Sequence, residues 1–212
     1  MTPIRRAAIA AITVAALACQ TPAPADQPAT VAASTSAIVP EGVPGSQDAF
    51  WNHLQRVCGQ AFRGRLTEGN ASDSTFRRAE LIMHVRQCAP TEIRIPFHAD
   101  SDRSRTWVLT RTGSGLRLKH DHRHADGSAD SVTQYGGDTR DAGTATRQEF
   151  FADAHTAALI PAAKANVWTV EVEPGARFAY ALRREGTDRR FRVEFDLTAR
   201  VPAPPPPWGA TP

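Results

Sequence analysis

Residues 168–197 read WTVEVEPGARFAYALRREGTDRRFRVEFDL and carry the clearest structural signal in the chain. Apolar side chains recur at every second position in three runs, which are separated by Pro174-Gly175 and by the loop 186–188. Charged side chains occupy most of the positions between them. This alternation is typical of antiparallel strands that are joined by short turns and have one face in water. The stretch therefore predicts a meander of three strands.

The same period of two recurs earlier in the chain. It is present in residues 81–86, 93–97, 107–109 and 116–118, which gives roughly seven to nine expected strands. We therefore predict a mainly β fold, in which an antiparallel meander forms a small barrel-like or sandwich sheet. The distinction matters because a closed barrel can hold a ligand inside, whereas a packed sandwich usually does not.

One amphipathic helix is predicted ahead of the strands and packed on the sheet. Ser46 or Asp48 can cap it, and Gly64 is expected to end it. A single stripe of residues at helical spacing carries its apolar side chains: Phe50, Trp51, Leu54, Val57, Cys58, Ala61 and Phe62. A helix with one apolar stripe has to lie against another part of the fold, so we expect this stripe to cover an edge or end of the sheet.

The N-terminus predicts export. Two arginines at 5–6 precede the uncharged apolar run 7–18, which ends in small residues before Cys19. A signal peptide has this form, and the run is too short to span a bilayer, which needs about 20 apolar residues. An ordinary secretory signal that is cleaved nearby is the alternative, in which Cys19 has no special role.

The placement of Cys19 also resembles the lipobox of bacterial lipoproteins, although Ala16 stands where that pattern prefers Leu. The resemblance implies cleavage before Cys19 and lipidation of this residue. Because Gln20 follows in place of the Asp that resembles an inner-membrane retention signal, it also implies transport to the outer membrane. We expect a cell-envelope protein that is held on the membrane through a lipid anchor.

Four parts of the chain are predicted. Residues 1–18 are the signal peptide, 19–45 a disordered linker rich in Pro, Ala, Ser and Thr, 46–200 a β-rich globular domain, and 201–212 a disordered proline-rich tail. The composition, 41% hydrophobic and 22% charged, suits one core. Loss of two arginines with the signal would lower the net charge from +3 to +1, so nucleic acid is not an expected partner.

Two cysteines remain after Cys19. In an oxidising envelope we expect Cys58 and Cys88 to form a disulfide, which would pin the predicted helix to the segment around Cys88. A catalytic thiol is the alternative, but no nearby histidine or acid marks either residue.

The candidate site lies in the histidine-rich stretch LRLKHDHRH at residues 116–124. In an extended strand every second side chain shares a face, so His120, His122 and His124 lie on the same side as Leu116 and Leu118. Leucines mark the inward side. The histidines therefore begin from the core face rather than from the solvent face.

Turn signals place neighbours beside these histidines. A turn at Gly113-Ser114 would set Trp107 beside His120 and Arg105 beside His122. A two-residue hairpin loop at Asp126-Gly127 would set three further pairs: His122 with Ser131, His120 with Thr133, and Leu118 with Tyr135. The same register would set Arg123 opposite Asp130 as a charge pair on the outer face.

Three interpretations of this stretch stay open. The first is a pocket for a small polar or anionic ligand, lined by Arg105, Trp107, His120, His122, Ser131, Thr133 and Tyr135. The second is a transition-metal site formed by His120, His122 and His124. The third is a structural polar rim. Catalytic motifs are missing from the sequence, and we expect neither an enzyme nor, outside the metal alternative, a cofactor.

Residues 81–86, 118–127 and 135–138 resemble segments of a group of exported proteobacterial proteins. The resemblance implies export and a β-rich domain, and it carries no activity, cofactor or catalytic residue. The sequence therefore favours an exported lipoprotein with a non-catalytic domain that binds a small ligand. A structural or interaction protein with a partner in the cell envelope is the alternative.

Overall fold

The computed structural model describes residues 45–210. The predicted signal peptide, Cys19 and the linker fall on residues 1–44 and lie outside the described residues, as do residues 211–212. Five short helical segments are present: α1 (Gly45–Arg56), η1 (Ala71–Asp73), α2 (Ser74–Arg78), α3 (Ala154–Leu159) and η2 (Pro161–Ala163). Within residues 45–210 no helix is long and apolar enough to cross a lipid bilayer.

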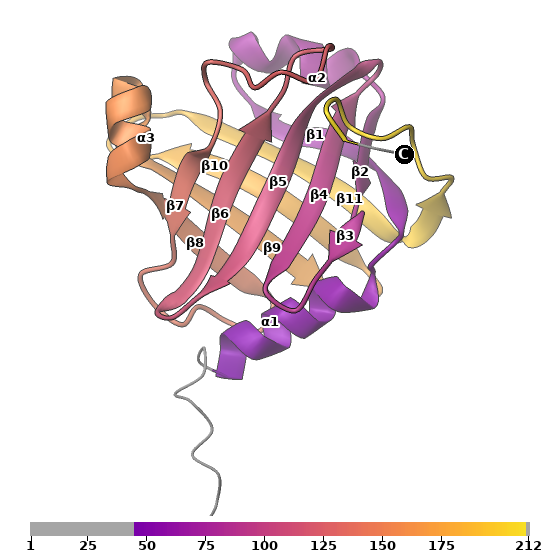
Figure 1. Cartoon of the computed structure of the whole chain (residues 1–212), viewed down its shortest axis with the longest axis horizontal. Coiled ribbons are helices and arrows are strands. Elements are labelled where there is room, and N and C mark those ends of the chain that lie inside the picture. Colours follow the sequence, from indigo (N-terminus) through magenta and orange to yellow (C-terminus); the bar gives the residue numbers. More distant parts are fainter. Residues whose placement is uncertain (1–44, 211–212) are drawn as a thin grey trace, which may run out of the picture. The chain divides into compact units, whose positions relative to one another are not determined.

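Antiparallel strands make up most of the domain, which confirms the mainly β prediction (Figure 1). The strands are β1 (Ala61–Gly69), β2 (Leu81–His84), β3 (Gln87–Cys88), β4 (Glu92–Ala99), β5 (Asp102–Thr112), β6 (Gly115–His122), β7 (Tyr135–Asp138), β8 (Arg147–Ala152), β9 (Asn166–Glu173), β10 (Arg177–Arg184) and β11 (Arg190–Val201). Along the sheet they run in the order β2-β1-β11-β10-β9-β8-β7-β6-β5-β4-β3.

The sheet closes into a barrel because β2 pairs with two neighbours. It pairs with β1 through Ala61 and His84, and with β4 through Leu81 and Ala99. Ten strands thereby form a closed ring, and the short β3 extends from β4 outside the ring. The barrel-like alternative is thus the correct one. Closure also removes the exposed edges that an open sheet would present.

Alternating side chains of the strands fill the barrel, as the period of two predicts. In β9 to β11 the inward positions are almost all buried: Trp168, Val170, Val172, Phe178, Tyr180, Phe191, Val193, Phe195 and Leu197. Leu182 is only partly buried. The intervening charged residues lie on the outer face, where Arg192 and Glu194 form an ion pair. The predicted three-stranded meander is confirmed.

Helix α1 lies across one end of the barrel (Figure 1). Its side chains Phe50, Trp51 and Leu54 are buried in the core. The Arg111 guanidinium lies 4.8 Å from the Trp51 ring centre and also pairs with Asp48. The predicted packing of the helix is confirmed, and this end of the barrel is closed by apolar side chains.

The helix is shorter than predicted. It ends at Arg56, and residues 61–62, expected in its last turn, instead begin strand β1. Ala61 and Phe62 pair with β2 on one side and with β11 on the other. Ala61 and Phe62 could bury their side chains in the core from a helix or from a strand. The strand forms because pairing with β2 and β11 satisfies the backbone N–H and C=O groups on both sides.

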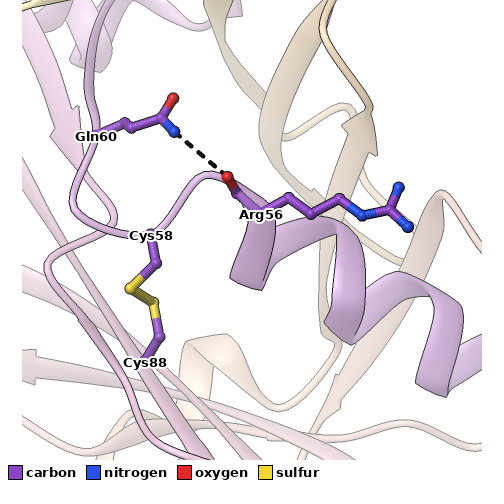
Figure 2. The surroundings of a disulfide bond; sticks show 4 residues. All are labelled: Arg56, Cys58, Gln60 and Cys88. Atoms are coloured by element: carbon purple, nitrogen blue, oxygen red, sulfur yellow. Dashed lines mark hydrogen bonds between the residues drawn. A yellow bond between two sulfur atoms is a disulfide. The ribbon is translucent and has the colours of Figure 1, made fainter.

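The predicted disulfide joins Cys58, in the turn after α1, to Cys88 in β3 (Figure 2). Beside it, the Gln60 side chain donates a hydrogen bond to the carbonyl of Arg56, the last residue of the helix (3.3 Å). The bond closes a loop with a sequence separation of 30 residues. It links the helix that closes the barrel to the side of the sheet, as expected.

The sequence also predicts a loop at residues 69–75, and the opening of a long loop at residues 135–138, where glycines break the alternation. The structure differs at both places. Residues 69–75 contain η1 and the start of α2, and residues 135–138 form strand β7. A Cβ atom at Gly137 would lie 1.6 Å from the Phe151 carbonyl oxygen, so glycine here permits a close approach of two chains rather than a turn.

The tail also differs from the prediction of a disordered segment. Its described part runs along the outside of the barrel beside the first residues of β5 (Figure 1). The Trp208 amide donates to the carbonyl of Arg103 (3.1 Å), and the Arg103 guanidinium donates to the carbonyl of Pro206 (2.9 Å). The four consecutive prolines do keep this segment extended, as their fixed backbone angle requires.

Candidate functional site

A cavity of about 360 Å³ opens at the end of the barrel opposite α1. We call it the cup. Seven aromatic side chains line it: Phe76, Phe97, Trp107, Tyr135, Trp168, Tyr180 and Phe191. Polar side chains complete the lining: Asp73, Arg105, His120, His122, Asp130, Asn166, Arg184 and Arg189. The apolar remainder is Val132, Ile160, Ala163 and Leu182.

The predicted pairing of the histidine strand with its first neighbour is confirmed. In the β5–β6 hairpin, Arg105 lies opposite His122 and Trp107 opposite His120. The turn falls at residues 113–114, as the sequence indicates. Because the two strands keep this register throughout, both pairs project from the barrel wall into the cup.

The predicted pairing with the second neighbour is wrong by two residues. His120 lies opposite Tyr135 rather than Thr133, and nearer the turn Arg123 lies opposite Ala129 rather than Asp130. The Asp130 carboxylate accepts the Val132 amide (2.8 Å), which holds extra residues in the loop. A shift of two residues preserves the side of the sheet, so Tyr135 still faces inward.

Two of the seven predicted lining residues are therefore outside the cup. Ser131 is exposed in the loop and bonds to Asp130 (3.3 Å). The Thr133 hydroxyl accepts the backbone amide of His122 (2.8 Å) and so supports the strand rather than the cavity. The predicted pair of Arg123 with Asp130 does not form either, since Arg123 donates to Asp121 (2.9 Å).

Parallel aromatic rings form the floor of the cup. Trp107 stacks on Phe97 with ring centres 4.9 Å apart, and on Tyr180 at 4.4 Å. Phe76 of α2 continues the stack over Phe97 at 5.8 Å. Beside it, His120 stacks on Tyr135 at 4.4 Å. Such stacking adds to the apolar burial of each ring and fixes its orientation, so the floor is preformed.

A hydrogen-bonded chain crosses this floor. The His120 Nδ1–H donates to the carbonyl of Tyr135 (3.1 Å), which leaves Nε2 to accept from the Tyr180 hydroxyl (2.7 Å). The Tyr135 hydroxyl is in turn hydrogen bonded to Nε2 of His122 (3.1 Å). Two side-chain pairs, His120 with Tyr180 and His122 with Tyr135, are therefore held by hydrogen bonds within the protein, and the Tyr135 backbone joins them.

Burial keeps this chain uncharged. It lowers the pKa of His120 to about 3 and raises the pKa of Tyr135 to about 12. Burial, followed by the nearby positive charge of Arg105, also lowers the pKa of His122. Burial raises the pKa of Tyr180 well above its ordinary value. At neutral pH the floor is thus polar and neutral, because the low dielectric disfavours every charged form.

Three arginines surround the floor. Arg189 pairs with Asp73 through both terminal nitrogens and also donates to Asn70. Arg105 pairs with Asp102, and the Nε of Arg184 donates to Asn166 (2.8 Å). Among residues 45–210 the remaining N–H groups of Arg105 and Arg184 have no hydrogen-bond partner. Donors of two guanidinium groups are thus available to a molecule in the cup.

The predicted three-histidine metal site does not form. Within residues 45–210 no group of three or more His, Cys, Asp and Glu side chains is arranged to hold a metal ion. Both ring nitrogens of His120 are already bonded to tyrosines, and His124 is exposed in the loop after β6. A metal ligand needs a free nitrogen lone pair, which His120 uses for the Tyr180 hydroxyl.

Several lining residues were missed as site residues. Trp168 and Tyr180 were predicted to face the core, and their alternation was the available signal, but only closure of the barrel brings them opposite His120. Phe76 and Arg189 directly follow the predicted loops 69–75 and 186–188, where no alternation indicates the direction of a side chain.

In comparisons of the chain with known proteins, no protein-family model, no curated protein and no solved structure matches it.

Proposed function

We propose that this domain is a non-catalytic binding domain whose cup holds a small organic anion with a flat, apolar body. One observation carries the proposal: an aromatic cavity with unused guanidinium donors at its sides lies at the end of the barrel that α1 does not close. Apolar cavities with a few fixed polar groups are the usual form of small-molecule sites.

The flat body of the ligand follows from the walls. A ring that enters the cup meets the edges of the stacked Phe97, Trp107 and Tyr180 rings, and it also meets Trp168. A ring in contact with these side chains gains apolar burial and edge-to-face aromatic contacts. The side chains that would contact the ligand are already locked by their neighbours, so little conformational entropy is lost on binding.

The negative charge of the ligand follows from the arginines. Arg105 and Arg184 project from strands β5 and β10, and each retains N–H donors. A planar guanidinium recognises carboxylate or phosphate oxygens with charge-assisted hydrogen bonds. The lowered pKa of His122 keeps this ring neutral beside Arg105, so the positive charge of this pair comes from Arg105.

The outer face of the barrel favours the cup over the alternative of an interaction protein. Across β9 to β11 the charged side chains satisfy one another: Arg192 pairs with Glu171 (2.6 Å), and Arg177 pairs with Glu194 (2.7 Å). A face whose charges are already paired offers few unsatisfied groups to a partner. Together with the predicted signal and Cys19, the cup supports an exported lipoprotein that captures a small ligand in the cell envelope.

Changing the two arginines tests the anionic part of the proposal. We expect wild-type protein to bind 2-naphthoate, and the Arg105→Gln/Arg184→Gln double variant to bind it at least about tenfold more weakly, because each charge-assisted bond contributes about 1.5–3 kcal/mol. Isothermal titration calorimetry measures both affinities. The neutral 2-naphthamide should bind wild type and variant equally.

Arg117→Gln is the matched control, since this arginine pairs with Asp138 on the outer face. Its affinity for 2-naphthoate should equal that of wild type. An equal loss in Arg117→Gln and in the double variant would show that general charge, rather than the cup, attracts the anion.

A further inference from the structure

The described part of the C-terminal tail, residues 202–210, contacts the two segments that form one side of the cup. One is the start of β5, where Arg103 exchanges hydrogen bonds with Pro206 and Trp208. The other is the β6–β7 loop, where the backbones of Gly127 and Gly209 touch. We call residues 100–105 and 123–134 the rim, and residues 202–210 the strap.

Cup residues lie within the rim. Arg105 lies two residues after Arg103, and Asp130 and Val132 belong to the loop that contains Gly127. The two rim segments are themselves connected, because the Arg123 amide donates to the carbonyl of Ser104 (2.9 Å). The strap therefore fixes, from outside the barrel, the chain segments that present the guanidinium and the loop to the ligand.

Two hydrogen bonds join the strap to Arg103 of β5. Prolines lack an amide hydrogen, so a run of four cannot form a strand ladder with the barrel. The hydrogen bonds to Arg103 and the close contact at Gly209 are what fixes its outer end. Attachment of this kind is readily reversible, unlike a paired strand.

The seated strap also leaves a polar atom unsatisfied. His98 lies on the outer face of β4, opposite Ile82, and lines a cavity together with Pro202 and Pro205. Its Nε2 is buried and has no hydrogen-bond partner among the described residues. Release of the strap would return this nitrogen to water, and its hydration would offset part of the free energy lost with the strap contacts.

We propose that the strap controls the cup: seated, it orders the rim and holds Arg105 and the β6–β7 loop in the binding geometry, and released, it loosens both and weakens ligand binding. This inference rests on the proposed function of the cup and adds its regulation.

Gly209→Val in the full-length protein tests the inference. A Cβ atom at this position would lie 2.9 Å from the Gly127 carbonyl oxygen, and the backbone φ of +76° already disfavours a side chain, so valine should unseat the strap. The matched control is Gly175→Val. Its φ of +69° imposes the same strain, but a Cβ atom meets nothing within 4 Å.

Two readouts are needed, amide hydrogen exchange by NMR and affinity for 2-naphthoate. In Gly209→Val we expect the amides of Trp208, Arg123 and Gly127 to exchange at least about tenfold faster, because the strap no longer orders the rim. We expect the affinity for 2-naphthoate to fall about fivefold or more, because the rim has to become ordered on binding. The control should change neither. Faster exchange at Trp208 with unchanged exchange at Arg123 and Gly127 would overturn the inference, as would an unchanged affinity.

The two proposals fail in different ways. If wild-type protein does not bind 2-naphthoate, the proposed function is what fails, and control of binding falls with it. The exchange rates would still decide whether the strap orders the rim. If wild type binds 2-naphthoate but Gly209→Val does not change the rim or the affinity, the proposed binding site is retained and control by the strap is rejected.

Discussion

Lowering the pH from 7 to 4.5 is expected to remove about 3–5 kcal/mol from the free energy of unfolding. Burial lowers the pKa of His120 to about 3 and that of His98 to about 4, from an ordinary value of 6.5. Below pH 6.5 the unfolded chain therefore binds protons at both histidines that the folded chain does not bind. Stability is complete above pH 6.5 and falls as the pH decreases toward the folded values.

The magnitude follows from the width of this window. One pKa unit corresponds to about 1.4 kcal/mol per group, and the window from 6.5 to 4.5 spans about two units for each histidine. Lowered pKa values of His84 and His122 act in the same direction. Asp153 and Glu171 have lowered pKa values in the folded state, so their protonation in acid also destabilises the fold. This effect sets in chiefly below the ordinary carboxyl pKa values near 4.

Urea unfolding of the His98→Gln/His120→Gln double variant at several pH values checks this account. The variant should be less stable than wild type at pH 7, yet lose much less further stability down to pH 4.5. His124→Gln is the control, because this histidine is exposed in the loop. A double variant whose stability falls as steeply as that of wild type would show that other groups cause the acid sensitivity.

Trp107→Ala is expected to destabilise the domain by about 3–5 kcal/mol, the range for a large buried aromatic side chain. This ring is 2% exposed and lies in the middle of the floor, in contact with Phe97, Phe178 and Tyr180. Its loss removes apolar burial and stacking on both faces, and the locked neighbours cannot collapse into the space.

Trp208→Ala is the matched control for the same substitution. Trp208 is only partly buried in the strap, so its change should cost less than about 1 kcal/mol. Chemical denaturation measures both variants. Equal losses at the two positions would mean that the stack on the floor does not contribute as its geometry indicates.

The sequence allowed prediction of those features that depend on alternation or on a turn of fixed length. The inward faces of β9 to β11 followed from the period of two, and the register of Trp107 with His120 followed from the turn at residues 113–114. The Cys58–Cys88 disulfide could be predicted from the expected oxidising compartment alone, because only these two cysteines remain after Cys19. The inward faces and the register are each set by residues within one segment or one hairpin.

Features that depend on distant contacts could not be predicted. Residues 61–62 fit a helix locally, and only β2 and β11 assign them to a strand. The register of Tyr135 depends on a loop whose side chains bond to their own backbone, such as Asp130 with Val132. Closure of the barrel through β2 and β4 determines which aromatic residues meet in the cup. The position of the strap likewise depends on contacts with Arg103, far away in the sequence.

The most direct test of the central claim, that the cup binds a flat organic anion, uses the four tryptophans as position markers. Trp107 and Trp168 line the cup, Trp51 lies in α1 at the other end, and Trp208 lies in the strap. A ¹H–¹⁵N NMR titration of the wild-type protein with 2-naphthoate resolves their indole N–H signals. We expect saturable shifts at Trp107 and Trp168 and none at Trp51. Shifts confined to Trp51 or Trp208, or no saturable shift at all, would contradict the claim.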